Sequence, residues 1–250
     1  MKIALDAFGS DRAPYPEVEG AVLAANDKCC SKIFLVGIQA VLKKELERFY
    51  YPENSIKIIN ATEQIDPSKK PTSELKKKKD SSLVKSVNLV KEHEADALVS
   101  AGSTGAVMVA SLLTFGRIPG VNRPALAISL PTISEPEIVL DVGANVDCDA
   151  NNLVQFAEMG SIYSSYFLKK KNPRIALINI GEESKKGNEV SIEAHQKLQE
   201  LKSINFIGNI EGKDILKGVA DVIICDGFIG NIMLKTVEGV ALSLFEIFKQ

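Results

Sequence analysis

Short apolar, β-rich runs alternate with amphipathic stretches along almost the whole sequence, and this rhythm constrains the fold more than any other feature. Several runs are nearly continuous Val, Ile, Leu and Ala, which is typical of strands covered on both faces. The runs are 3–7, 33–37, 56–60, 97–100, 125–130, 138–142, 175–180, 205–208 and 222–225. Helical patterns lie between many of them, at 17–26, 40–49, 83–92, 152–168, 190–202 and 232–248. The alternation predicts an α/β fold, a three-layer αβα sandwich with a largely parallel sheet.

Composition limits the classes of protein to which the chain can belong. Its 250 residues are 45% hydrophobic and 25% charged, so a large core can form. No internal repeat or linker marks a boundary, and we expect a single domain over residues 1–250. The net charge of −2 argues against nucleic-acid binding through bulk positive charge. No apolar run reaches the ~18 residues of a membrane span, and Asp6 interrupts any signal-peptide core, so a cytoplasmic protein is expected.

Five of the apolar runs end in segments rich in glycine and small polar residues. These segments are 6–11, 100–105, 141–145, 179–183 and 225–231. In open α/β sheets ligands bind outside the carboxyl ends of the strands, where glycine lets backbone N–H groups approach an anion and the next helix begins with its positive end toward it. One such segment alone also fits an ordinary helix cap. Five at one sheet edge favour an anion site, and none matches a P-loop or a standard dinucleotide motif.

No side chain stands out as a protein nucleophile or general base. His93 and His195 both fall in charged, helical surroundings, which predicts solvated surface residues. Cys225 precedes Asp226, whose charge would raise the pKa of the thiol, so Cys225 is predicted to pack rather than react. All four cysteines are expected to be reduced thiols. If the chain is an enzyme, the substrate itself can be the nucleophile, because anionic phosphate needs positioning and a stabilised oxyanion rather than a base.

Ordered motifs along the whole chain give it a family resemblance. They are MKIALDA at 1–7, KDSS at 79–82, EADA at 94–97 with SAG at 100–102, PG at 119–120 with RPA at 123–125, DVGANVDC at 141–148, LVQF at 153–156, NIGEE at 179–183, KGNE at 186–189, NFIGNIEG at 205–212, and CDGFIGN at 225–231 with LK at 234–235. On these motifs the sequence closely resembles the PlsX family, the phosphate acyltransferases of bacterial phospholipid synthesis.

The resemblance implies an activity and a set of partners. The family moves a fatty acyl group from acyl-carrier protein to inorganic phosphate, and a membrane acyltransferase then uses the acyl phosphate to acylate glycerol 3-phosphate. Its fold is like that of phosphotransacetylase and of isocitrate and isopropylmalate dehydrogenases. Members are usually homodimers that associate peripherally with the inner face of the membrane. The resemblance therefore implies no cofactor, no metal and no nucleic-acid partner.

The chain departs from the family pattern at three places. Relatives usually read Gly-Gly-Asp-His-Ala-Pro in the first segment, whereas this chain has Ser10 and Arg12 at the second and fourth positions. If the histidine of relatives carries a proton, Arg12 cannot replace it, but if it binds an anion, Arg12 can. Ser103 stands where relatives commonly have asparagine. The chain also ends in an apolar helical pattern at Gln250, where relatives continue for several tens of residues, so it is expected to lack their C-terminal segment.

For phosphate, the sequence favours the second glycine-rich segment. The hydroxyls of Ser103 and Thr104 and the backbone around Gly102 and Gly105 suit a tetrahedral anion, with an ordinary helix cap as the alternative. Arg12 is a further candidate ligand.

Four side chains are candidates to polarise the thioester carbonyl or to hold phosphate. They are Asn179, Lys186, Asn231 and Lys235, and either lysine could equally be a solvated helix residue. Asp6, Asp141 and Asp226 would repel a phosphate, so they are predicted to organise the loops.

Two other functions stay open at this point. One is a phosphotransacetylase that acts on a short acyl-CoA, and the other is a non-catalytic scaffold that binds acyl-carrier protein or membrane. A dehydrogenase is disfavoured because no nicotinamide motif is present.

A run of lysines is the most basic part of the chain. Lys69, Lys70 and Lys76–Lys79 lie in the long polar stretch 61–82, which is predicted to be a surface excursion that ends in a helix start. These charges would attract an acidic carrier protein, or they could simply solubilise an exposed helix.

Overall fold

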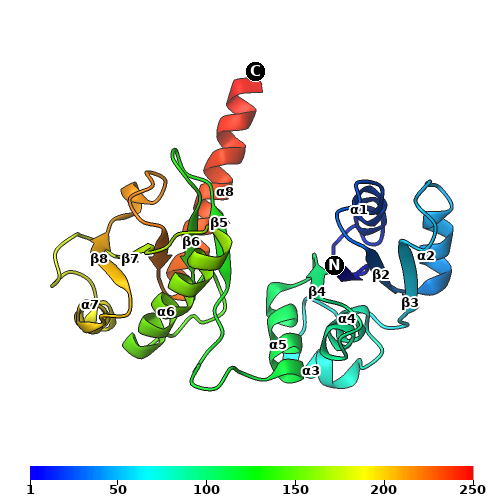
Figure 1. Cartoon of the computed structure of the whole chain (residues 1–250), viewed down its shortest axis with the longest axis horizontal. Coiled ribbons are helices and arrows are strands. Elements are labelled where there is room, and N and C mark those ends of the chain that lie inside the picture. Colours follow the sequence, from blue (N-terminus) through cyan, green and yellow to red (C-terminus); the bar gives the residue numbers. More distant parts are fainter. Residues whose placement is uncertain (250) are drawn as a thin grey trace. The chain divides into compact units, whose positions relative to one another are not determined.

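The structure is a computed structural model that describes residues 1–249, and it divides into two compact units (Figure 1). The first unit is Met1–Gly116 and the second begins at Arg117. All nine predicted strands are present, but they form two sheets rather than one. The short connection between the units contains two glycines and two prolines, residues that are typical of loops between regular elements. The single domain over residues 1–250 stays a prediction.

The first unit has four parallel strands in the order β3-β2-β1-β4. Its elements are β1 (Lys2–Asp6), α1 (Tyr15–Asn26), β2 (Lys32–Gly37), α2 (Gln39–Leu46), β3 (Ile56–Asn60), α3 (Pro71–Lys77), α4 (Ser82–Lys91), β4 (Ala97–Ser100) and α5 (Thr104–Phe115).

Alternate residues of β2 explain why this strand is apolar throughout. Ile33 and Leu35 pack into a core with α1 and α2, whereas Phe34 and Val36 pack into another with Leu89 of α4. Because successive side chains of a strand point to opposite faces, helices cover both faces of the sheet at this strand.

The second unit has five strands in the order β5-β6-β9-β7-β8, all parallel except β5. Its elements are β5 (Ala127–Leu130), β6 (Glu137–Leu140), α6 (Ala150–Phe167), β7 (Arg174–Ile178), α7 (Glu189–Glu200), β8 (Asn205–Ile210), the 3₁₀ turn Gly212–Asp214, β9 (Val222–Ile224) and α8 (Gly227–Lys249). The predicted largely parallel α/β architecture is therefore confirmed for both sheets.

The central strand β9 shows why the second unit is also a layered sandwich. Val222 and Ile224 pack against Phe156 of α6, whereas Ile223 belongs to a second core with Ile210 and residues of α8. Burial on both faces again accounts for a continuous apolar strand.

All six predicted helices are present, and two further helices were not foreseen. Pro71–Lys77 forms α3 inside the predicted surface excursion, and Thr104–Phe115 forms α5 directly after a glycine-rich segment. The missed α5 is apolar on most of its surface, so its sequence lacks the two-sided pattern by which the other helices were recognised.

Helix α8 differs from the others in how little of it is buried. No uninterrupted apolar run in the sequence is long enough to cross a membrane, but α8 as a whole has the length and the apolar composition to do so. Its most apolar 18-residue stretch has a mean hydropathy of 1.4, and 6% of that stretch is buried. Core helices of soluble proteins pass the same test, so this property does not decide where the protein resides. Its exposed end carries large apolar side chains such as Leu242, Phe245 and Phe248.

Candidate active site

In the first unit, hydrogen bonds and a close backbone contact join the segments after β1 and β4 at the carboxyl edge of the sheet. The Asp6 carboxylate is 2% exposed, and its Oδ2 accepts a hydrogen bond from Ser100 Oγ at 2.8 Å. Ser100 Oγ in turn accepts the Gly102 N–H at 3.1 Å. A Cβ atom at Gly9 would lie 2.7 Å from the Gly102 nitrogen, so only glycine allows the two backbones this approach.

A cavity of about 160 Å³ opens between these segments. Gly102 and Ser103 line it, as predicted for a phosphate site, together with Gly9 and Ser10. Other lining residues come from a neighbouring loop and the start of α4, among them Gln64, Pro67 and Ser82. Sequence reasoning assigned no role to Gln64 or Ser82, although Ser82 lies in one of the family motifs.

Two helices direct their amino ends toward this cavity. Ser82 is the first residue of the ten-residue helix α4, and Ser103 immediately precedes the twelve-residue helix α5. The helix dipole makes both ends favourable for an anion. At α4 the N–H groups of Ser82 and Val84 already donate to the Glu63 carbonyl and to Ser81 Oγ, so α5 offers more free N–H groups than α4. Ser81 caps α4 through its side chain, whereas Ser103 makes no side-chain capping bond to α5. The Ser103 hydroxyl is therefore available to a ligand.

The remaining predicted phosphate ligands lie outside the small cavity. Thr104 is exposed, and Gly105 is near Pro71. Arg12 is exposed and lines a separate groove of about 730 Å³ between α1 and the strands β1 and β4. The structure thus brings together Gly102 and Ser103 but not the other three.

In the second unit, Asp141 organises the segment after β6. Its side chain is fully buried and accepts five hydrogen bonds, with donor–acceptor distances of 2.7 to 3.2 Å. The donors are the N–H groups of Leu126, Gly143, Ala144 and Asn145 and the side-chain amide of Asn145. The segment's shape therefore depends on one carboxylate.

The segment after β9 lies against the one held by Asp141. The Gly227 N–H donates to the Asn145 carbonyl at 2.8 Å, and a Cβ atom at Gly230 would collide with the Asp141 carbonyl oxygen. Asp226 caps α8 by accepting the Ile229 N–H at 2.8 Å.

Asn231 and Lys235 both lie on exposed turns at the start of α8. Asn231 is beside Gly143, so it borders the segment after β6. Lys235 forms an exposed ion pair with Glu238 at 2.7 Å, one turn along the helix. That pairing fits the solvated-residue alternative for Lys235, since exposed pairs of this kind contribute little.

The third predicted segment of this unit follows β7. Asn179 folds it back by donating from Nδ2 to the Lys186 carbonyl at 2.9 Å and accepting the Ile180 N–H at 2.8 Å. Gly187 has φ +98°, and a Cβ atom there would lie 2.5 Å from Asn179 Oδ1. Lys186 is exposed and has no ion-pair partner among residues 1–249.

The five segments thus lie at the edges of two sheets, not at one edge as the sequence analysis supposed. Those after β1 and β4 belong to the first sheet, and those after β6, β7 and β9 to the second. Sequence position shows where strands end but not which strands pair.

One of the two histidines was misjudged from the sequence. His93 is exposed, as predicted, but His195 is only 6% exposed. Its Nδ1 bonds to Asn209 Oδ1 at 2.9 Å, and Phe206 packs edge-on against the ring. The charged residues around it in sequence lie on the other faces of α7, so local composition concealed its burial.

The buried thiol of Cys225 and the half-buried thiol of Cys148 are poor nucleophiles, as predicted for Cys225. Burial raises the pKa of Cys225 well above its ordinary range, and the charge of Asp226 adds to the effect. Burial also raises the pKa of Cys148 to about 11. A thiol must lose its proton to attack, so neither group can act near neutral pH.

Within residues 1–249 no three His, Cys, Asp or Glu side chains are grouped as a metal site.

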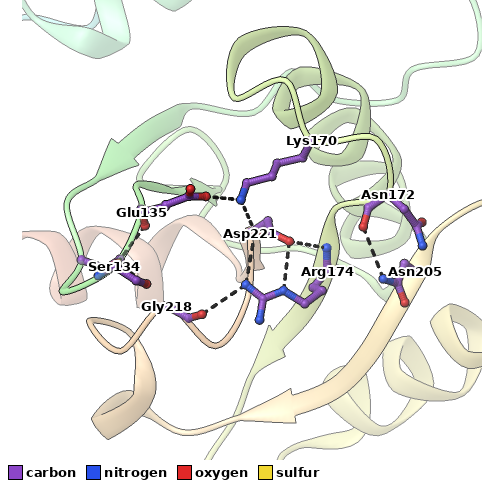
Figure 2. A network of polar contacts seen from close by, with 9 residues as sticks. Ser134, Glu135, Lys170, Asn172, Arg174, Asn205, Gly218 and Asp221 are labelled. Carbon is purple, nitrogen blue, oxygen red and sulfur yellow. Dashed lines mark hydrogen bonds and ion pairs between the residues drawn. The ribbon is translucent and has the colours of Figure 1, made fainter.

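A polar network occupies the opposite, amino edge of the second sheet (Figure 2). The Arg174 side chain donates two hydrogen bonds to the Asp221 carboxylate, at 3.1 and 3.2 Å. Lys170 forms ion pairs with both Asp221 and Glu135. Burial opposes ionisation of Asp221, but the bonds from Arg174 outweigh it and lower its pKa. The contacts tie the start of β7 to the residue before β9.

Glu137, at the start of β6, lies at this same edge. Burial raises its pKa to about 7, and neither carboxylate oxygen has a hydrogen-bond partner in the described part of the chain. Strongly shifted carboxyls often mark active sites. Here the shift lies at the edge opposite the glycine-rich segments, within the electrostatic influence of Arg174 and Asp221, so we do not place Glu137 in the candidate site.

The fold and loops define a class of protein, and comparison with known proteins gives the family. The structure is similar to the EutD phosphotransacetylase of Staphylococcus aureus, with a TM-score of 0.67 and 18% identity over 96% of this chain and 82% of that one. It is also similar to a branched-chain phosphotransacylase of Enterococcus faecalis, with a TM-score of 0.58 and 14% identity over 95% of this chain and 84% of that one. At these identities the likeness defines a phosphotransacylase-like fold.

Sequence comparison is more specific. The family model described as "Fatty acid synthesis protein" matches residues 1–250. The chain is 49% identical to the phosphate acyltransferase of Dictyoglomus turgidum over 99% of its own length and 47% identical to that of Halothermothrix orenii over 100%. It spans 74% and 75% of those two proteins. The chain belongs to this family of phosphate acyltransferases, and the resemblance to PlsX is confirmed.

Proposed function

We propose that this chain transfers a fatty acyl group from acyl-carrier protein to inorganic phosphate, giving acyl phosphate for phospholipid synthesis. The observation that carries the proposal is the set of glycine-rich loops beside a cavity suited to an anion, in a chain of this family. The family relationship supplies the reaction, and the cavity suggests where phosphate binds.

The chemistry requires only phosphate and the thioester. A phosphate oxygen attacks the carbonyl carbon, a C–O bond forms, and the C–S bond breaks with its electron pair leaving on sulfur. The carrier thiolate then takes a proton from solvent. The protein contributes by positioning phosphate and by stabilising the charge that develops on the carbonyl oxygen.

Phosphate is assigned to the cavity lined by Gly102 and Ser103. Its volume of about 160 Å³ accommodates a tetrahedral anion, and the amino ends of α4 and α5 supply favourable dipoles. Asn179, Lys186, Asn231 and Lys235 remain predicted groups for the thioester carbonyl. Among them Lys186 has no ion-pair partner within residues 1–249, whereas Lys235 is paired with Glu238.

The reaction is tested by measuring acyl phosphate formation with two donors. We expect the chain to consume long-chain acyl-carrier protein in a phosphate-dependent reaction, with acetyl-CoA as a much poorer donor. Trapping the product as the hydroxamate measures acyl phosphate directly. Preference for acetyl-CoA would indicate a phosphotransacetylase instead, and a folded protein that forms no product with either donor would contradict an enzymatic role.

We also propose that the exposed lysines at the end of α3 attract the acidic carrier protein. Lys76, Lys77 and Lys79 are exposed, whereas Lys78 is half-buried. Lys78 donates to the Gln64 carbonyl at 2.6 Å and pairs with Glu74 at 2.8 Å. Lys78 therefore stabilises a loop that lines the cavity, and the other three are free to meet a partner.

Reversing only the three exposed lysines gives a clean test. We expect Lys76→Glu, Lys77→Glu and Lys79→Glu together to raise the Michaelis constant for acyl-carrier protein about tenfold at low salt, because surface charge mainly alters encounter rate. The effect should shrink as salt is added. The matched control reverses Lys43, Lys44 and Lys91, which are also exposed. Equal effects of both triple changes would show that only net charge matters.

Location and assembly follow from the same family relationship. We propose a cytoplasmic homodimer that associates peripherally with the inner face of the membrane and passes acyl phosphate to a membrane acyltransferase. The exposed apolar end of α8, with Leu242, Phe245 and Phe248, supports a further contact with a partner surface or lipid.

A further inference from the structure

We propose that His195 is a positioning residue for the loop that carries Asn179 and Lys186, and that it acts through Asn209. The inference deepens the proposed function and rests on it for the catalytic role of that loop. The relay itself is a feature of the second unit and can be tested without the reaction.

The relay links three elements through buried groups. His195 lies on α7 and is 6% exposed, and Asn209 lies on β8 and is 7% exposed. Their side chains bond at 2.9 Å, and Asn209 Nδ2 donates to the Glu183 carbonyl at 3.0 Å. Glu183 belongs to the segment that follows β7, so the buried pair His195–Asn209 connects this loop to α7 and β8.

In the two hydrogen bonds that join His195, Asn209 and Glu183, the donor of each can be assigned. A backbone carbonyl can only accept, so the amide nitrogen of Asn209 must face Glu183 and its amide oxygen must face His195. His195 must therefore carry a proton on Nδ1. The arrangement has one consistent orientation, and it holds for both neutral and protonated imidazole because Nδ1–H donates in each.

Glu183 passes this restraint to Lys186. Its carbonyl also accepts the Lys186 N–H at 3.1 Å, and the Lys186 carbonyl accepts from Asn179 Nδ2 at 2.9 Å. The backbone of Lys186 is thus held on both sides, by Glu183 and by Asn179. Among the described residues, Asn209 is the only group outside the loop that donates a hydrogen bond to the Glu183 carbonyl. Without it, the backbone to which the Lys186 N–H donates is no longer held in place.

The test compares a variant that removes the donor with one that keeps it. His195→Leu removes Nδ1–H, whereas the amide nitrogen of His195→Asn can occupy nearly the same place. We expect His195→Leu to lower kcat about 10-fold to 100-fold, since small misplacement of a reacting group costs that much, with the Michaelis constant for phosphate unchanged. His195→Asn should recover most of the activity.

A second readout reports on the loop itself. Amide hydrogen exchange at Lys186 should become faster in His195→Leu and stay slow in His195→Asn. The matched control is Leu198→Ala, which removes a fully buried side chain from the same helix that takes no part in the hydrogen bonds of the relay. It should lose stability but keep kcat and the slow exchange at Lys186. If His195→Leu does not fold, Asn209→Ala carries the same test, because it removes the donor to the Glu183 carbonyl without adding a charge.

Two results would overturn the inference. One is unchanged exchange at Lys186 in His195→Leu, and the other is an equal loss of kcat in Leu198→Ala. Should the unaltered chain form no acyl phosphate, the proposed function fails on its own. Exchange at Lys186 would then still decide whether His195 positions the loop.

Discussion

Asp141→Asn should destabilise the second unit by about 3–5 kcal/mol, because an amide cannot accept all the bonds that the carboxylate accepts. One amide oxygen could still serve three N–H groups, but the amide NH₂ would then face the two donors of Asn145. At least two buried donors would be left without an acceptor. Urea unfolding followed by circular dichroism measures the loss.

Asp226→Asn is the matched control for this prediction. Asp226 also follows a strand end, but it is half-buried and accepts a single bond, from the Ile229 N–H. Asparagine can accept the same bond and caps helices about as well as aspartate, so Asp226→Asn should cost well under ~1 kcal/mol. If both variants unfold at the same urea concentration, the five bonds to Asp141 contribute no more than one cap, which would contradict our account of the loop.

Ser103→Ala should raise the Michaelis constant for phosphate about 10-fold to 100-fold, because a hydrogen bond to a charged ligand contributes about 1.5–3 kcal/mol. Its melting temperature should not change, since the hydroxyl makes no capping bond in the described chain. Thr104 is left unaltered because it does not line the cavity. Steady-state kinetics with varied phosphate and saturating acyl donor give the constant.

Ser81→Ala is the comparison for that experiment. Ser81 caps α4 by accepting the Val84 N–H at 3.4 Å. Its loss should lower stability by about 1 kcal/mol and leave the kinetics of phosphate use nearly unchanged. The opposite result, with Ser103→Ala destabilised and its use of phosphate unaffected, would make Ser103 a cap and remove it from the site.

Patterns of neighbouring residues were enough to predict the strands, most of the helices and the family. Continuous apolar runs such as 33–37 and 222–225 are typical of strands buried on both faces, because a half-exposed strand would alternate. Glycine-rich segments after those runs marked the loops at the carboxyl ends, since glycine is needed where backbones approach closely. Strand patterns and glycine-rich loops depend on residues that are close together in the sequence, so they can be predicted without a structure.

Which side chains meet depends on how the elements pack, and this could not be predicted from neighbouring residues. Strand pairing divided the five segments between two sheets, and it placed Ser82 and Gln64 in a cavity that a glycine motif alone could not define. His195 looks solvated from its charged neighbours in sequence, yet one face of α7 turns it inward to Asn209, fourteen residues away. Asp141 resembles Asp226 at the level of sequence but accepts five bonds instead of one. Partners distant in the chain set burial and hydrogen bonding, and they are fixed only when the elements pack.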